Sequence, residues 1–68
     1  MKLTLTLLGR DSWSRPVYEG DDGRLYVDTD PCADRPSSIC TKYQNTFDGE
    51  PDTPVNAEFA FIPYRDIW

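Results

Sequence analysis

The sequence predicts a mainly β fold: one small domain over residues 1–68, built as an antiparallel sheet of three to five strands around a central hairpin, with little or no helix. Apolar and polar residues alternate near both ends of the chain, which is the period of a half-buried strand. A strong turn signal, Gly20-Asp21-Asp22-Gly23, separates two short apolar runs. A chain of this length buries only about 60% of its unfolded surface, so we expect a thin core and no large active-site cleft.

The first strand is predicted over residues 2–8, where leucine alternates with threonine. This alternation places Leu3, Leu5 and Leu7 on one face, and the polar stretch that begins at Gly9 ends the strand. The segment has neither the basic start nor the long apolar run of a signal peptide or a membrane span, so neither is expected.

The central hairpin joins residues 16–19 to residues 24–28. In the best register, residues 21–23 form the loop, a type I turn followed by Gly23 in the left-handed region. This register predicts two cross-strand pairs on opposite faces: Val17 with Val27, and Tyr18 with Tyr26.

The second half of the chain has weaker signals. Pro31 ends the hairpin, and residues 30–38 are predicted as an irregular loop or a single helical turn. Residues 39–43 form either a short strand, which we favour, or one turn of helix. Residues 44–54 are rich in turn formers and are predicted as loop, with Phe47 tucked beneath it.

The last strand is predicted over residues 57–62, with Phe59 and Phe61 on one face. These phenylalanines and the leucines of the first strand are the two strongest apolar stripes, so they should meet in one core. The expected core residues are Leu3, Leu5, Leu7, Val17, Val27, Phe59 and Phe61.

The chain is acidic, with 12 Asp and Glu against 7 Lys and Arg and a formal net charge of -5. Such a chain is repelled by DNA, RNA and anionic lipid, so we expect no direct nucleic-acid binding and no membrane partner. Its natural electrostatic partner is the basic surface of a nucleic-acid-binding protein. Homo-oligomer formation stays open.

Catalysis is not expected, because the sequence has no histidine, the commonest general base and metal ligand. Cys32 lies beside Asp30 and Asp34, whose charges oppose a reactive thiolate. Calcium binding by Asp28, Asp30 and Asp34 is an alternative to loop solvation, but the glycine and terminal glutamate of an EF-hand loop are missing. We therefore predict no enzyme, no metal and no cofactor.

The only cysteines, Cys32 and Cys40, are expected to be reduced thiols of a cytoplasmic protein. A secreted domain of this size usually has four or more cysteines. A disulfide is the first alternative, and a metal site is the second.

Ten of the 12 acidic residues fall in two rows. Arg24 is the only basic residue in the first row, and the second row lies between Lys42 and Arg65. Rows of carboxylates can imitate a phosphate backbone and occupy the basic groove of a nucleic-acid-binding protein. The alternative is an acidic surface kept for solubility. The rows predict the partner-binding residues Asp21, Asp22, Asp28, Asp30, Asp48, Glu50 and Asp52.

Three aromatic residues outside the predicted strands are further candidates for partner binding: Trp13, Tyr64 and Trp68. Tryptophan and tyrosine are enriched in interface hot spots, although a lone tryptophan such as Trp13 more often covers the rim of a core. These residues support an alternative function, a structural or assembly module that binds partners or itself through exposed aromatics and sheet edges.

Four stretches of the chain hold packing and turn motifs: GRDSWSRPVYE, GRLYVDTDP, ICTKYQNTFDGEPDTPV and FIPYRDIW. They support a resemblance that covers nearly the whole chain. In these motifs the chain resembles small proteins of conjugative elements and phages of gut Firmicutes, in particular one of the large polyvalent protein-associated domains. The resemblance implies a cytoplasmic bacterial or phage protein of a mobile genetic element, stand-alone here and a module elsewhere. Such families include candidates for countering host restriction or CRISPR defence. The resemblance assigns no functional residue.

Charge pattern and resemblance together predict a small acidic protein-binding module. The expected activity is inhibition of a nucleic-acid-handling host-defence protein, of the anti-restriction or anti-CRISPR type, through a face that mimics DNA.

Overall fold

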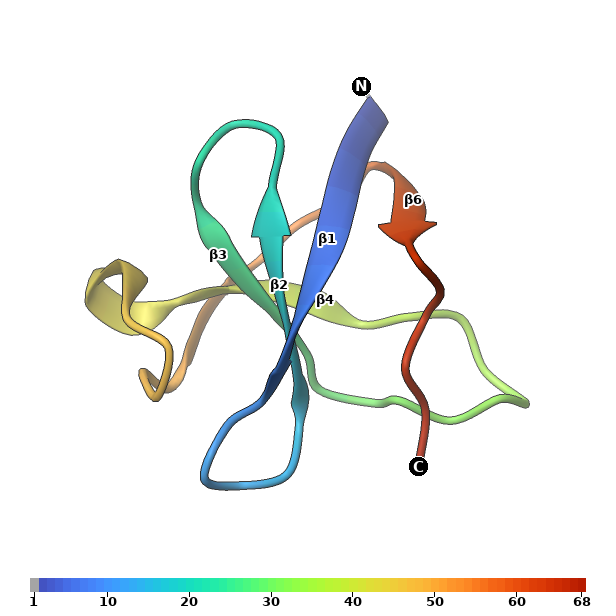
Figure 1. The fold of residues 1–68 in the computed structure, drawn as a ribbon, viewed down its shortest axis with the longest axis horizontal. Helices are drawn as coiled ribbons and strands as arrows, with labels where there is room; N and C mark the ends of the chain where they lie inside the picture. Colours follow the sequence, from blue (N-terminus) through green and yellow to red (C-terminus); the bar gives the residue numbers. More distant parts are fainter. Residues whose placement is uncertain (1) are drawn as a thin grey trace.

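Figure 1 shows the computed structural model, which describes residues 2–68. Its strands form one six-stranded sheet with the order β5-β4-β3-β2-β1-β6. The elements are β1 (Lys2–Arg10), β2 (Pro16–Gly20), β3 (Leu25–Asp28), β4 (Ile39–Lys42), the 3-10 turn η1 (Tyr43–Asn45), β5 (Pro51–Pro54) and β6 (Glu58–Ile62). The mainly β prediction is confirmed. The sheet has more strands than predicted, and β6 runs parallel to β1, whereas the other neighbouring strands are antiparallel.

The sheet is strongly curled, because only residues 55–57 connect its two edge strands. A flat sheet with this strand order would hold its edges about 24 Å apart, at ~4.8 Å per strand spacing. The chain from Pro54 to Glu58 spans at most about 14 Å. In Figure 1 this connection passes behind the sheet, and its Val55 packs against the core. The sheet therefore forms a partly open barrel.

The barrel interior holds the apolar core. Leu3 and Leu5 of β1 pair with Phe59 and Phe61 of β6, so the predicted meeting of the leucine and phenylalanine stripes is confirmed. The ring of Phe61 makes an edge-on contact with Tyr18, with 5.2 Å between ring centroids. The core consists of Leu3, Leu5, Tyr18, Tyr26 and Ile39, with Leu7, Val55, Phe59 and Phe61 packed around them.

The prediction that Val17 and Val27 belong to this core is wrong. The hairpin register itself is confirmed, since Val17 pairs with Val27 and Tyr18 with Tyr26. However, Leu7 of β1 pairs with Tyr18, which places both tyrosines on the leucine face. The two valines are fully buried on the opposite face.

That opposite face carries a second, largely buried row across four strands. Gly9, Val17, Val27 and Cys40 are consecutive register partners in β1, β2, β3 and β4. A bulge in β1 between Leu7 and Gly9 brings Gly9 into this row. The ring of Phe47 lies over its end, 3.8 Å from the position of a Cβ at Gly9, although Phe47 itself stays 37% exposed. A thin sheet thus has buried side chains on both faces.

The hairpin turn follows the predicted geometry. Gly23 has a φ of 83°, its N–H donates to the carbonyl of Gly20 over 3.0 Å, and Gly20 N–H donates to the carbonyl of Arg24 over 2.8 Å. These bonds close a type I turn followed by a left-handed glycine, as predicted.

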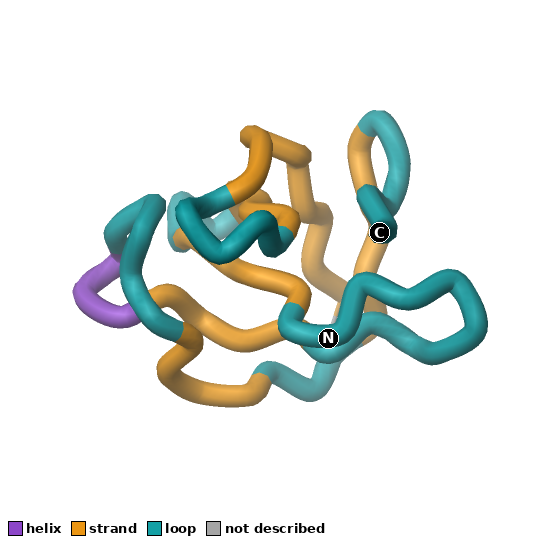
Figure 2. The backbone as a smooth tube through the Cα atoms, turned by 90° about the horizontal axis from the view of Figure 1, so that it is seen from below, coloured by secondary structure: helices purple, strands orange, loops and turns teal. Residues whose placement is uncertain are grey.

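The prediction that residues 44–54 are all loop is wrong. The segment contains most of η1 and the edge strand β5. Pro51 and Pro54 lack an N–H, which an edge strand tolerates because its outer side needs no donor. Residues 39–42 form a strand, so the favoured alternative there is confirmed, and residues 29–38 form an irregular loop. Figure 2 shows η1 at one end of the molecule and this loop at the other.

Candidate functional site

Most basic side chains are engaged within the molecule. Among residues 2–68, five of the seven Lys and Arg side chains form ion pairs with four acidic residues. The pairs are Arg10–Asp66 (3.0 Å), Arg15–Asp11 (3.3 Å), Lys42–Asp11 (2.8 Å), Arg35–Asp30 (3.4 Å) and Arg65–Asp28 (3.2 Å).

The other eight acidic residues form no ion pair with any described residue, and all of them are exposed. Among the basic residues of the described chain, only Lys2 and Arg24 form no ion pair, so its unpaired charge is strongly negative. The eight residues are Glu19, Asp21, Asp22, Asp34, Asp48, Glu50, Asp52 and Glu58.

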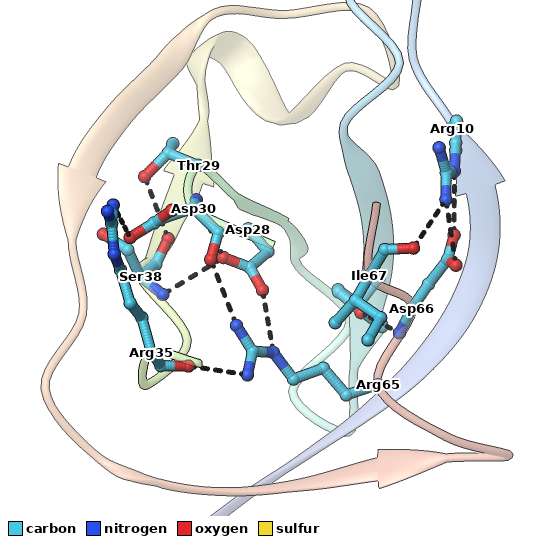
Figure 3. Close-up of polar contacts among 10 residues, drawn as sticks. Arg10, Asp28, Thr29, Asp30, Arg35, Ser38, Arg65, Asp66 and Ile67 are labelled. Atoms are coloured by element: carbon cyan, nitrogen blue, oxygen red, sulfur yellow. Dashed lines mark hydrogen bonds and ion pairs between the residues drawn. The ribbon is translucent and has the colours of Figure 1, made fainter. Parts of the chain in front are cut away.

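Asp28 has a different environment from the one the sequence suggested. Its side chain is fully buried, so it cannot belong to an exposed acidic row. Its Oδ1 accepts hydrogen bonds from the backbone N–H of Asp30 (3.0 Å) and Ser38 (3.1 Å), and its Oδ2 accepts from Arg65 Nε (3.2 Å; Figure 3). Asp30 is half-buried and pairs with Arg35. Asp28 therefore anchors the loop and the C-terminal tail.

Arg65 and its neighbours fix that tail. The Arg65 guanidinium also donates to the carbonyl oxygens of Arg35 (2.9 Å) and Asp30 (3.1 Å), as Figure 3 shows. Arg10 holds Asp66 through two hydrogen bonds, of 3.0 and 3.1 Å. This contact keeps the pKa of Asp66 below its ordinary value. The backbone N–H of Asp66 donates to the buried Tyr18 hydroxyl over 3.0 Å.

The three predicted aromatic candidates are all exposed: Trp13 by 52%, Tyr64 by 60% and Trp68 by 68%. Trp68 Nε1 donates to the carbonyl of Ser14 over 2.9 Å, and the Arg15 guanidinium lies 4.8 Å from the Trp13 ring centroid. Trp68 thus contacts the β1–β2 loop that carries Trp13. Trp13 does not cover the core, and we call Trp13, Tyr64 and Trp68 the aromatic surface.

A buried charge cluster joins the β1–β2 loop to β4, and no motif predicts it. Lys42 Nζ donates to Asp11 Oδ2 over 2.8 Å, and both side chains are fully buried. Burial alone would raise the pKa of Asp11, but hydrogen bonds from Lys42 and from the Arg15 backbone hold that pKa below its usual value. Only tertiary structure brings Asp11 and Lys42 together, 31 residues apart in the chain.

The predicted acidic rows are brought together in part. An open hollow of about 700 Å³ lies beside the hairpin turn, and its lining includes Asp22 and Arg24 of the turn and Asp52 of β5. Asn45 Oδ1 accepts the Leu25 N–H over 2.7 Å, which holds η1 against β3. We define the acidic rim as the exposed carboxylates of the hairpin turn and of residues 50–52: Asp21, Asp22, Glu50 and Asp52. The predicted Asp48 lies apart from them, because its Oδ1 accepts the Ser12 N–H of the β1–β2 loop over 3.1 Å.

Asp22 is fixed in this rim by its own turn. Tyr26 Oη donates to Asp22 Oδ2 over 2.6 Å, and the Arg24 N–H donates to Oδ1 over 3.0 Å. The hydrogen bond from Tyr26 lowers the pKa of Asp22, so this carboxylate is ionised at neutral pH. Asp28 and Asp30 lie at the opposite end of β3 and are separate from the rim.

Both cysteines are free, and burial raises the pKa of the Cys40 thiol. Among residues 2–68, no three His, Cys, Asp or Glu side chains are grouped so as to hold a metal ion. The same residues include no helix of the length and apolarity needed to cross a membrane.

No protein-family model, curated protein or solved structure matches this chain. The resemblance to a mobile-element domain therefore stays a prediction, and the function must be argued from the exposed surface.

Proposed function

We propose that this protein is a binding module without catalytic activity, and that its acidic rim binds the basic surface of a nucleic-acid-binding protein. The observation that carries the proposal is the distribution of charge. Five of the seven arginines and lysines are engaged in internal ion pairs, whereas the carboxylates beside the hollow form no ion pair within residues 2–68. Such a surface attracts cations and repels nucleic acid.

The rim has two properties that a phosphate mimic needs. The charge of Asp22 is present at neutral pH, because the hydrogen bond from Tyr26 lowers the pKa of this carboxyl. The rim charges are also carried on backbone that is held in place, because the turn is closed by Gly20 and Gly23 and η1 is tied to Leu25. Fixed carboxylates lose less entropy on binding than carboxylates on a mobile tail.

The resemblance to mobile-element domains suggests the class of target. A phage or conjugative element meets restriction and CRISPR proteins in the bacterial cytoplasm, and those proteins bind DNA through basic grooves. We therefore place the protein in that compartment, as an inhibitor that competes with DNA for such a groove.

The test is capture from a bacterial lysate by the immobilised protein. Partners should bind at low salt, dissociate at high salt and be displaced by short duplex DNA, because all three effects follow from electrostatic competition. The variant Asp21→Lys with Asp52→Lys should lose these partners, because it reverses two charges of the rim. It should keep its fold, since both side chains are exposed and accept no hydrogen bond from residues 2–68.

A matched control has the same change of net charge elsewhere. Asp34→Lys with Glu58→Lys alters two exposed, unpaired acids outside the rim. This control should keep the partners. Equal loss by both variants would mean that net charge alone acts, and retention by both would refute a role for the rim.

A further inference from the structure

The two edges of the sheet are protected very differently. The edge strand β5 contains Pro51 and Pro54, which have no N–H to offer, and the charged Asp52 between them. Prolines and charges are common devices that keep an edge strand from pairing with another chain. The edge strand β6 has the sequence EFAFI, with no proline and with Glu58 as its only charge. The protection of β5 is missing from β6.

The outer side of β6 is also free within the molecule. Its residues pair with β1 on one side, and no other hydrogen bond from residues 2–68 reaches their backbone groups. Every second N–H and C=O of β6 therefore points away from β1 without a protein partner. Figure 1 shows β6 at the margin of the sheet, beside β1 and with no described strand on its other side.

We propose that β6 pairs antiparallel with β6 of a second copy of this chain, with Ala60 on the two-fold axis. In this register Phe59 lies opposite Phe61 of the second copy, and Glu58 lies opposite its Ile62. Aromatic pairs across strands are favourable, and no like charges face each other. A parallel, in-register pairing would instead bring the two Glu58 side chains together. Keeping the two Glu58 charges apart thus favours the antiparallel arrangement.

The side chains of β6 support the same occupant. Phe59 and Phe61 are only half-buried in one chain, and Ile62 is 49% exposed. Pairing with a second copy would cover the free edges of these side chains and extend the sheet across both molecules. The strand has five residues, so the interface is small and the dimer should be concentration-dependent and not obligate.

Sedimentation velocity over a range of concentrations tests the proposal. The mass should rise from the monomer value of 7.8 kDa towards twice that value. Ala60→Lys and Ala60→Glu should each weaken association roughly fivefold, because like charges then face each other across the axis. An equimolar mixture of the two variants should restore association. The uncharged control Ala60→Thr should associate as the parent does, and circular dichroism should show each variant folded.

The unmodified protein offers an independent measurement. Outward amides of β6 should exchange more slowly with solvent at high than at low concentration, whereas the Asp52 amide of β5 should not change. A protein that stays monomeric at every concentration overturns the proposal, even if β6 binds a strand of another protein. The proposal is also overturned if Ala60→Lys and Ala60→Glu each dimerise as the parent does, or if an equimolar mixture of the two fails to restore association.

Discussion

At the scale of single residues, two carboxylates from the same acidic row have opposite roles. Asp22 is exposed and ionised at the rim, whereas Asp28 is fully buried and holds together the 29–38 loop and the tail. A count of charges treats them as equal. Their environments show that charge reversal at Asp28 would test folding and not partner binding.

Asp28→Ala should lower the free energy of unfolding by about 3–5 kcal/mol, because it leaves Arg65 and two backbone N–H groups without their acceptor. Asp28→Asn should cost less, since its carbonyl oxygen can still accept from the backbone of Ser38. The exposed Asp34→Ala serves as control and should stay within about 0.5 kcal/mol of the parent. Urea denaturation measures all three, and a parent-like Asp28→Ala would contradict the anchoring role.

The contact between Tyr26 and Asp22 predicts loss of stability at both extremes of pH. Burial and the neighbouring Asp22 raise the pKa of Tyr26 to about 12, from about 10 in an unfolded chain. This contribution is fully present below pH ~10 and is lost as pH rises through about 12. The lowered pKa of Asp22 has the opposite sign, so its contribution is present above pH ~4 and is lost on further acidification.

Thermal unfolding between neutral and strongly alkaline pH measures the first effect. Tyr26→Phe should show a smaller decrease of Tm above pH ~10 than the parent, because the ionising hydroxyl is absent. The buried Tyr18, whose pKa burial also raises, should leave a residual decrease in the variant. An identical alkaline decrease in both proteins would contradict the assignment to Tyr26.

At the scale of elements, local signals predicted local structure. The turn of the β2–β3 hairpin, its register and the alternation of β1 and β6 follow from neighbouring residues, and the structure confirms them. Strand β5 could not be predicted, because its two prolines are typical of a loop and its pairing with β4 has no signal in the sequence. The pairing of Leu7 with Tyr18, which places Val17 and Val27 on the face opposite the leucines, has no local signature either.

The candidate site was predictable only in part, for the same reason. The exposure of Asp21 and Asp22 follows from the turn, and the exposure of the aromatic surface agrees with its place outside the strands. The burial of Asp28 depends on Arg65, which lies 37 residues further along the chain. The contact of Asp11 with Lys42 likewise arises from packing. No spacing rule in a single sequence marks such partners.

The turn of the β2–β3 hairpin gives a clean test of backbone strain. Gly23 has a φ of 83°, and a Cβ at this position would meet no atom within 4 Å. Gly23→Val should therefore destabilise by about 1–2 kcal/mol through backbone conformation alone, and Gly23→Asn should cost less. Urea denaturation provides the measurement. Equal losses for valine and asparagine would mean that strain at this φ is not the cause.

At the scale of the whole molecule, two exposed surfaces lie far apart. The β2–β3 turn of the acidic rim and the β1–β2 loop that carries Trp13 stand at opposite ends of β2. Trp68 contacts that loop, so the two tryptophans of the aromatic surface lie at the second end. A partner that binds the rim should therefore be insensitive to the aromatic surface, and the two hypotheses of function can be separated by kinetics.

Asp21→Lys with Asp52→Lys should lower the association rate of a rim-bound partner about tenfold at low salt and flatten its salt dependence, because exposed charges act mainly by steering. Trp13→Ala should leave both rate constants unchanged. Surface plasmon resonance at several ionic strengths measures these rates with the partner that the lysate supplies. If Trp13→Ala instead raises the dissociation rate while the double reversal has no effect, the aromatic surface is the interface. The acidic rim then serves solubility, and the protein is an assembly module without a DNA-mimicking face.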